Sequence, residues 1–242
     1  MTEASAPPER FAEGEFRIDG VLNRAWSMLS RNFPMFFAVA AIASLPDLLL
    51  SNPGQDRGVF IAAALLSDVM RRVSQAMVVY GAFQEMRGAP VILVESLQVG
   101  WRRILPVIGL AISATVLMAV GFGLLIVPGL IVTAMLFVAT PVCVVEQLGP
   151  FASLERSAQL TKGHRWKIFG LLLLAVPAAI VSEAVDLAME MVDGGALLAS
   201  VGQVIWDAIW GAAAAVLVIA AYHDLRVAKE GVDTEQIAAV FE

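Results

Sequence analysis

Long apolar stretches separated by short charged segments dominate the sequence. Crossing about 30 Å of hydrocarbon takes roughly 20 helical residues. Six stretches reach or approach this length: 32–50, 61–86, 104–127, 128–145, 166–191 and 197–223. No charged residue occurs between Ile104 and Val145, which is too long for one span, and Val127-Pro128-Gly129 predicts a tight turn that divides it. The pattern therefore predicts an all-α polytopic membrane protein with six transmembrane helices.

An amphipathic segment precedes each odd-numbered span. In the first, apolar residues recur at helical spacing opposite a polar face, so the segment should lie flat at the membrane surface. These apolar residues are Ile18, Val21, Leu22, Ala25, Trp26 and Leu29. A second such segment runs over 94–104 and a looser third over 150–162. We predict three hairpins of transmembrane helices, each preceded by an interfacial amphipathic helix.

The even-numbered spans end on similar residues. Phe83-Gln84-Glu85-Met86-Arg87 matches Tyr222-His223-Asp224-Leu225-Arg226 in residue type at every position, and the same offset places Asp68 against Asp207. Val144-Val145-Glu146 is a fainter copy between them. These matches favour three parallel repeats around an axis along the membrane normal.

Basic residues in the short connections predict the orientation. Thirteen lie on one side of the predicted spans, against Arg57 alone on the other. They are Arg10, Arg17, Arg24, Arg31, Arg87, Arg102, Arg103, Arg156, Lys162, Arg165, Lys167, Arg226 and Lys229. The positive-inside rule then places both termini in the cytoplasm. We expect a disordered cytoplasmic tail over 1–15, a membrane domain over 16–228 and a C-terminal cytoplasmic tail over 229–242.

Composition supports a membrane location and narrows the partners. Apolar residues make up 59% of the chain, the mean hydropathy is +0.78 and only 16% of residues are charged. The net charge of −6 makes nucleic acid an unsuitable partner, so we expect membrane lipids and other membrane proteins instead. Cys143 is the only cysteine, which excludes an intramolecular disulfide and a Cys-based zinc site. We expect no cofactor and no bound metal.

Three motifs resemble a bacterial membrane-protein family. They are Glu146-x-x-Gly149-Pro150-x-x-Ser153-Leu154-x-Arg156-Ser157, Leu160-Thr161-Lys162-Gly163-x-x-Trp166, and Tyr222-x-Asp224-Leu225-Arg226-x-x-Lys229-Glu230-Gly231. The chain after about residue 16 resembles the membrane domain associated with glycerophosphoryl diester phosphodiesterases, which also stands alone in YciC-like inner-membrane proteins. The resemblance implies a bacterial inner-membrane location. It does not imply the phosphodiesterase activity, because no segment could form that separate soluble barrel.

Charged residues inside the predicted spans form the first candidate site. At about 1.5 Å of rise per residue, four of them lie in one layer of the membrane: Asp47, Arg72, Glu183 and Asp207. Arg71 and Asp68 lie within one turn of this layer. The two arginines could hold an anionic headgroup or carboxylate while the acids keep them charged. Alternatively, all these residues form salt bridges that lock the helices near the outer interface.

The second candidate lies where the fourth span ends. Glu146 could pair with Arg156 or Lys162 and fix the elbow that leads to Trp166 and the fifth span, which is a structural role. Trp26, Trp101 and Trp166 fit an aromatic belt at the membrane surface. Gly121-Phe122-Gly123 lacks the strand-to-helix context of a nucleotide-binding loop and predicts close helix packing instead.

These features lead to two functional hypotheses. The first is a non-enzymatic integral membrane protein with a scaffold, assembly or envelope-homeostasis role, because no set of residues suited to catalysis stands out. The alternative is a small transporter or lipid-handling protein that binds an anionic ligand at the intramembrane charge layer. A membrane-embedded hydrolase ranks third, because the charged residues of the spans are joined by no Ser/His pair.

Overall fold

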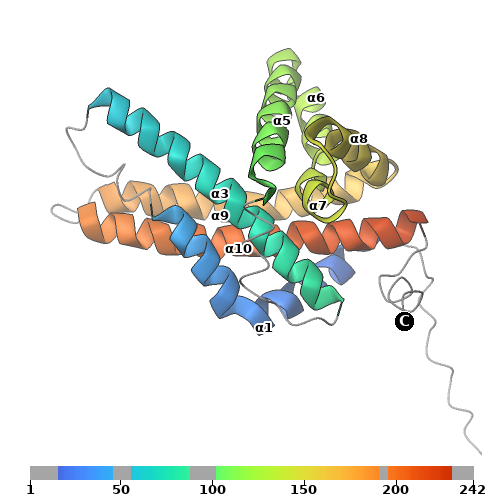
Figure 1. Cartoon of the computed structure of the whole chain (residues 1–242), viewed down its shortest axis with the longest axis horizontal. Coiled ribbons are helices and arrows are strands. Elements are labelled where there is room, and N and C mark those ends of the chain that lie inside the picture. Colours follow the sequence, from blue (N-terminus) through green and yellow to red (C-terminus); the bar gives the residue numbers. More distant parts are fainter. Residues whose placement is uncertain (1–15, 46–55, 88–101, 191–195, 231–242) are drawn as a thin grey trace, which may run out of the picture.

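The computed structural model describes residues 16–45, 56–87, 102–190 and 196–230, and all regular structure in these ranges is helical (Figure 1). The helices are α1 (Ile18–Ser44), α3 (Arg57–Met86), α5 (Ile104–Leu124), α6 (Ile126–Met135), α7 (Ala139–Val145), α8 (Pro150–Thr161), α9 (Arg165–Glu190) and α10 (Ala196–Glu230). The all-α class is confirmed for this part of the chain. Both predicted tails beyond 16–230 and most of the second amphipathic segment, including Trp101, lie outside the described residues.

Three helical stretches are long and apolar enough to cross a membrane. They are Ile104–Leu124 (α5), Ile126–Val145 (α6 with α7) and Val201–Glu230 in α10. Length and composition thus identify a membrane protein, with three such stretches among the described residues rather than the six expected. The first predicted span continues past Leu45, and several side chains of α3 and α9 are not described, so the first, second and fifth predicted spans stay predictions.

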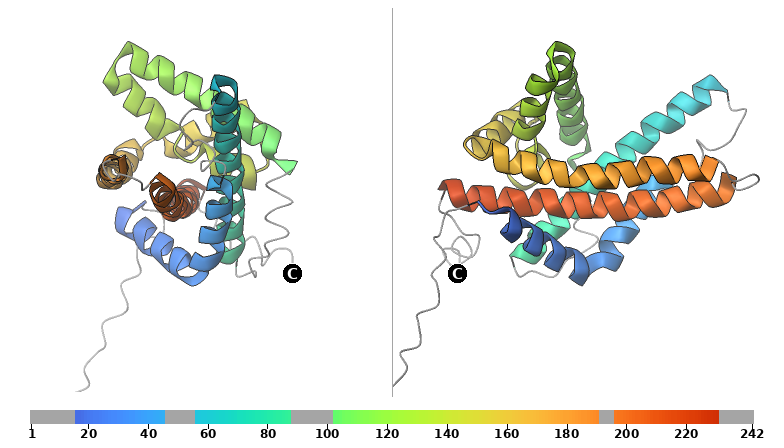
Figure 2. Two further views of the ribbon diagram at one scale, coloured as in Figure 1. Left: turned by 90° about the vertical axis from the view of Figure 1, so that its left-hand side faces the viewer. Right: turned by 180° about the vertical axis from the view of Figure 1, so that it is seen from behind.

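The helices do not form one bundle with a common direction. α9 and α10 lie side by side as two long antiparallel helices, and α1 and α3 pack against α10 (Figures 1 and 2). α5 and α6 pack on each other and stand at a steep angle to the α9–α10 pair (Figure 2). This arrangement differs from the predicted threefold bundle, in which all hairpins share one axis.

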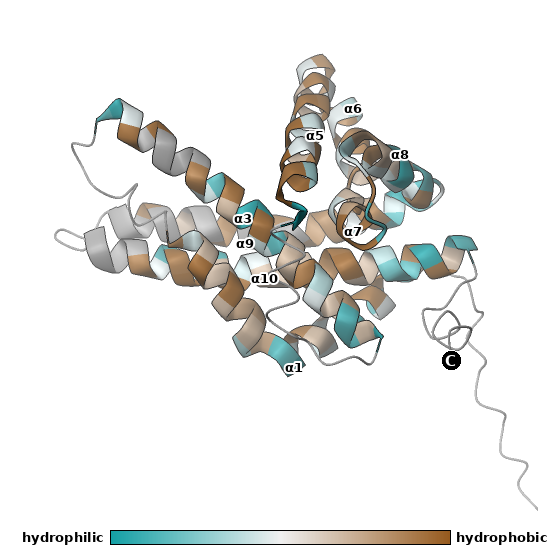
Figure 3. Ribbon diagram, viewed as in Figure 1, coloured by the Kyte–Doolittle hydropathy of each residue, from teal (hydrophilic) through white to brown (hydrophobic). Residues whose placement is uncertain are grey.

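Small side chains of α10 form the centre of the core. Ala208, Ala212, Val216 and Ala220 are fully buried at helical spacing, where α10 meets α1 and α3. Without a hydrophobic driving force between helices in lipid, small residues let backbones approach and gain van der Waals contact. By contrast, α5 is largely apolar (Figure 3), yet only 17% of its spanning stretch is buried, as expected for a helix whose solvent is lipid.

The first half of α1 is amphipathic, but its apolar residues divide between two surroundings. Val21, Ala25 and Met28 are buried against the core, whereas Leu22 and Trp26 are exposed. The predicted apolar face is therefore divided between the protein core and the open surface. The buried residues follow the 3.6-residue period, and the exposed pair lies beside them on the helix surface.

A kink separates this amphipathic half of α1 from its apolar half. Asn32 has a non-helical backbone (φ −118°, ψ 22°), and Pro34 follows two residues later. Pro34 has no N–H for the carbonyl of Ser30 and its ring crowds that carbonyl, which bends the helix. At the kink, the Asn32 side chain donates a 2.5 Å hydrogen bond from Nδ2 to Oε2 of Glu85 on α3.

The reversal between α5 and α6 lies at Leu125, which is extended (φ −168°, ψ 160°). The turn predicted at Val127-Pro128-Gly129 is therefore displaced. Pro128 instead occupies the first turn of α6, where a missing N–H costs no helical hydrogen bond. Close packing predicted at Gly121 is confirmed, because a Cβ there would lie 3.0 Å from Cα of Gly129.

We predict that Gly129→Ala destabilises the protein. A Cβ at Gly129 would lie 2.4 Å from the Phe122 ring, so the α5–α6 contact must open. Overpacking of this kind costs about 1–3 kcal/mol, measurable as a lower thermal unfolding midpoint in detergent. Gly123→Ala is the control, because its Cβ would meet nothing within 4 Å. Equal effects of the two substitutions would contradict the assigned contact.

Candidate functional site

The helical hydrogen-bond pattern is interrupted between α6 and α7, and a side chain of α8 supplies the missing hydrogen bond. Ala139 donates its N–H to Leu136, so the Met135 carbonyl loses its helical partner. The Ser157 hydroxyl donates a 2.7 Å hydrogen bond to that carbonyl, and Thr161 Oγ1, which donates to the Ser157 carbonyl at 2.9 Å, lies 3.4 Å from it. Broken helices in apolar surroundings require such replacement partners. α8 is therefore held by the backbone of its neighbour as well as by its apolar side chains.

A group of five charged and polar residues, here called the elbow network, connects α8 to α7 and α10. Its members are Glu146, Arg156, Tyr222, Arg226 and Glu230. Arg156 Nε lies 3.0 Å from Oε2 of Glu146, and its Nη2 contacts Glu230. The Tyr222 hydroxyl donates a 2.9 Å hydrogen bond to Oε1 of Glu146, and Arg226 Nε lies 3.0 Å from Glu230.

Electrostatic interactions in the elbow network favour the charged form of Arg156. Burial works against the charge on Arg156, but hydrogen bonds to Glu230 and Glu146 outweigh it and raise the pKa of Arg156. Of the two partners that the sequence offers Glu146, Arg156 is the one found. The sequence analysis did not assign Tyr222, Arg226 and Glu230 to this site. Their spacing of four residues places them on one face of a helix, and this spacing could have indicated that they interact.

A matching ion pair joins α1 to α10. Arg24 Nε lies 3.1 Å from Oδ1 of Asp224. Arg24 and Arg156 each contact an acid near the end of an apolar helix, Asp224 and Glu146 respectively. Both amphipathic helices, α1 and α8, are thus anchored by an arginine–carboxylate pair.

Further contacts fix the segments just before and just after α8. Arg103, just before α5, donates hydrogen bonds to the backbone carbonyl and to Oε1 of Gln147, at 2.9 and 2.8 Å. Gln147 has a left-handed backbone (φ 56°), which is unfavourable for a residue with a Cβ and here is held by Arg103. Beyond α8, the ring of His164 meets buried Phe16 edge-on, and Lys167 donates a 2.8 Å hydrogen bond to the Phe16 carbonyl.

The predicted charge layer is brought together only in part. Arg71 Nη1 lies 3.9 Å from Oδ2 of Asp207, joining α3 to α10. Arg72 Nη2 lies 3.5 Å from Oδ1 of Asp68, one turn earlier on α3. Of the remaining two acids, Asp47 lies outside the described residues and the side chain of Glu183 on α9 is not described.

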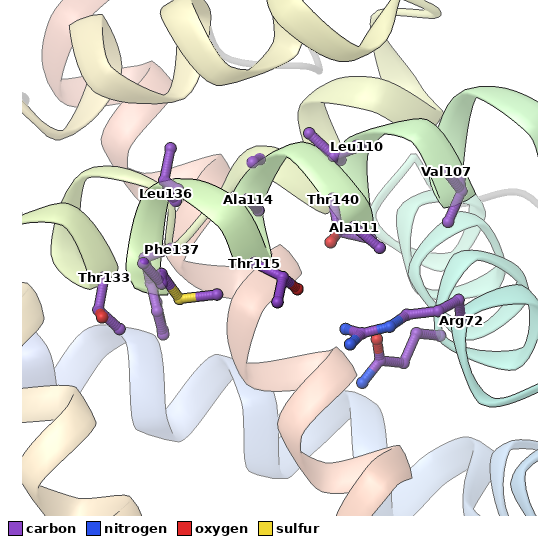
Figure 4. Close-up of a pocket in the computed structure, with 13 residues that line it drawn as sticks. Arg72, Val107, Leu110, Ala111, Ala114, Thr115, Thr133, Leu136, Phe137 and Thr140 are labelled. Carbon is purple, nitrogen blue, oxygen red and sulfur yellow. The ribbon is translucent and has the colours of Figure 1, made fainter. Parts of the chain in front are cut away.

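Arg72 differs from Arg71 because it lines two cavities between α3 and the α5–α7 segment (Figure 4). One has a volume of about 180 Å³ and includes three threonines, and the other has a volume of about 270 Å³ and is mainly apolar. The Nε atom of Arg72 is buried and makes no hydrogen bond within the described part of the chain. Arg71 lines neither cavity. The described residues contain no group of three or more His, Cys, Asp or Glu suited to a metal ion.

Together these features define an α-helical membrane protein with a clamped amphipathic elbow and a half-buried arginine beside its apolar hairpin. Comparison with known family models, curated proteins and solved structures finds no match for the chain. The resemblance to the membrane domain associated with glycerophosphoryl diester phosphodiesterases therefore stays a prediction that rests on the motifs alone.

We predict that Glu146→Ala destabilises the protein by about 1–3 kcal/mol, because it leaves Arg156 and Tyr222 without a shared acceptor. The measurement is thermal unfolding followed by helical circular dichroism in detergent. Glu155→Ala is the matched control, since Glu155 is an exposed acid on neighbouring α8 and should change stability by less than about 0.5 kcal/mol. A similar loss in both variants would show that the elbow network contributes no specific stability.

A second prediction concerns pH. Burial, followed by the positive charges of Lys229 and Lys167, lowers the pKa of His164. The unfolded chain therefore binds a proton more readily than the folded protein, so stability should fall as the pH drops through about 6.5, the ordinary value for histidine. His164→Gln should flatten this part of the stability-against-pH curve. An unchanged slope would mean that other groups cause any acid sensitivity.

Proposed function

We propose that the protein is a non-enzymatic integral membrane protein of a bacterial inner membrane, with a scaffold, assembly or envelope-homeostasis role. The observation that carries the proposal is the rigid attachment of α8 to the apolar helices. α8 is held through Ser157 on the Met135 carbonyl and through Arg156 between two acids. Such an attachment presents an amphipathic helix in one fixed orientation, which is what a docking platform at a membrane surface requires.

Exposed aromatic side chains support contact between these helices and lipid. Trp26 on α1, Phe151 at the start of α8 and Trp166 at the start of α9 are 72%, 77% and 86% exposed. Aromatic rings of this kind favour the boundary between headgroups and hydrocarbon. With the excess of arginine and lysine on the same side of the predicted spans, they favour a cytoplasmic location of α8 and of both termini.

The proposed topology consists of six spans arranged as three hairpins, each entered through an amphipathic helix. Its support is the paired anchoring of Arg24 to Asp224 and Arg156 to Glu146, which repeats one contact in two of the three proposed units. A steep angle between the α5–α6 and α9–α10 pairs would then have to close when the chain enters a bilayer.

A transporter or lipid-handling protein is the second candidate function. Its support is Arg72, a cation between two cavities alongside an apolar helix. Half-buried arginines at the depth of a membrane span are costly and commonly mark ligand or ion pathways.

The first test of the proposal is tryptophan quenching by brominated lipids. In proteoliposomes, variants that keep only Trp26 or only Trp166 should be quenched more by lipids brominated near the headgroup than by lipids brominated near the chain end. The reason is that both rings should lie at the interface. The control keeps only Trp210, a partly exposed residue within the α10 span, and should show the opposite preference.

Two outcomes would contradict the scaffold proposal. Absence of quenching of Trp26 and Trp166 by either lipid would show that α1 and the junction between α8 and α9 do not lie at the membrane surface. Movement of a solute or lipid across liposomes by the purified protein would favour the second candidate function instead.

A further inference from the structure

Arg72 lies at the junction of two cavities with different walls. The smaller, called here the hydroxyl-lined cavity, includes Gln75, Thr115, Thr133 and Thr140 among its lining residues. In Figure 4 the Arg72 side chain extends from α3 toward α5, where Thr115 lies. Guanidinium, hydroxyl and amide groups facing one space can all donate hydrogen bonds to an anionic oxygen.

The larger, called here the apolar cavity, continues from Arg72 along α5. Its walls include Val69, Ile108, Ile112 and Val116, with Asp68 at the edge. Ile112 and Val116 are 61% and 57% exposed, so this cavity borders the surface of α5 that faces lipid if α5 spans the membrane. Arg72 and Thr115 line both cavities, which therefore adjoin.

Position along α5 restricts how a ligand can arrive. The lining residues of α5 run from Val107 to Met118, inside the apolar stretch Ile104–Leu124. Neither end of this helix contributes, so the junction lies beside the middle of a span rather than at its polar boundary. A soluble anion would have to cross hydrocarbon to reach Arg72, whereas the head of an amphiphile can enter sideways from the bilayer.

The hydrogen bonding of the Arg72 guanidinium is incomplete. Asp68 lies 3.5 Å from Nη2 and is itself 60% exposed, while the buried Nε makes no hydrogen bond in the described part of the chain. A buried donor without an acceptor is destabilising, and an anion in the hydroxyl-lined cavity would supply the acceptor. Asp68 competes with such an anion for the same guanidinium.

We propose that the two cavities bind a single-chain amphiphile with a phosphate or carboxylate head. The head contacts Arg72 and Thr115 in the hydroxyl-lined cavity, and the acyl chain lies in the apolar cavity. Each volume falls below the roughly 300–1,000 Å³ of a pocket for a drug-sized ligand, which fits one head and part of one chain rather than a two-chain phospholipid. This binding site deepens the second candidate function and does not depend on the scaffold proposal.

The test measures binding of lysophosphatidate to the full chain in phosphatidylcholine nanodiscs by native mass spectrometry. Two further probes separate the sources of binding: monoacylglycerol of the same chain length, which lacks the phosphate, and inorganic phosphate, which lacks the chain. Lysophosphatidate should bind at least about tenfold more tightly than either probe, because it alone fills both cavities.

Substitutions then assign the site. Arg72→Gln should weaken lysophosphatidate binding at least about tenfold, and Ala111→Leu should weaken it by filling the wall shared by both cavities. Asp68→Asn should strengthen binding, since it removes a competing and repelling carboxylate. Arg71→Gln is the matched control, because it removes a neighbouring positive charge. The Arg71 side chain lines neither cavity, so this substitution should leave the affinity for lysophosphatidate unchanged.

Three results would overturn the inference. They are no lysophosphatidate binding to the folded wild-type protein, equal binding of inorganic phosphate or monoacylglycerol, and equal losses in Arg71→Gln and Arg72→Gln. Because Asp68→Asn predicts a gain, loss of fold cannot imitate that result. The quenching test of the scaffold proposal uses Trp26 and Trp166, which line neither cavity, so failure of this site and failure of the scaffold proposal are distinguishable.

Discussion

Glu146 is the acceptor on which the elbow of this protein depends. It lies at the end of the longest uncharged stretch of the chain and accepts from Arg156 on α8 and from Tyr222 on α10. In surroundings of low dielectric, a carboxylate needs nearby donors, and donors that share it are fixed relative to one another. One carboxylate therefore sets the relative positions of α7, α8 and α10, and with them the orientation of the exposed aromatic residues.

The spacing of apolar and small residues along the chain made most of the helices predictable. The apolar stretches, the amphipathic start of α1 and the small residues near Gly121 all follow from spacing alone. The α5–α6 turn was misplaced because proline and glycine suggest a turn, yet Pro128 is also acceptable in the first turn of a helix. The direction of the α5–α6 hairpin could not be predicted, since apolar surface in lipid lacks the burial signal that fixes packing in water.

Candidate sites were predictable only where partners are close in sequence. Arg156 lies ten residues from Glu146, and this pair was among those expected. Tyr222 lies 76 residues from the same glutamate, and no local pattern connects them. For the charge layer, the helical rise predicts the depth of a residue but not the direction of its side chain. Arg71 and Arg72 were placed at similar depths, and the structure adds that Arg72 lines cavities while Arg71 pairs with Asp207 on α10.

The placement of α10 has a consequence for how the protein is made. α10 is the last helix of the described residues in chain order, yet it contacts α1, α3, α7, α8 and α9 and carries partners of both Arg24 and Arg156. Helices are made in chain order, so Arg24 is synthesised well before its partner Asp224 on α10, whereas Arg156 already has Glu146. The contacts of α10 with both α1 and α8 can therefore form only once α10 has been made, so the described part of the fold closes late.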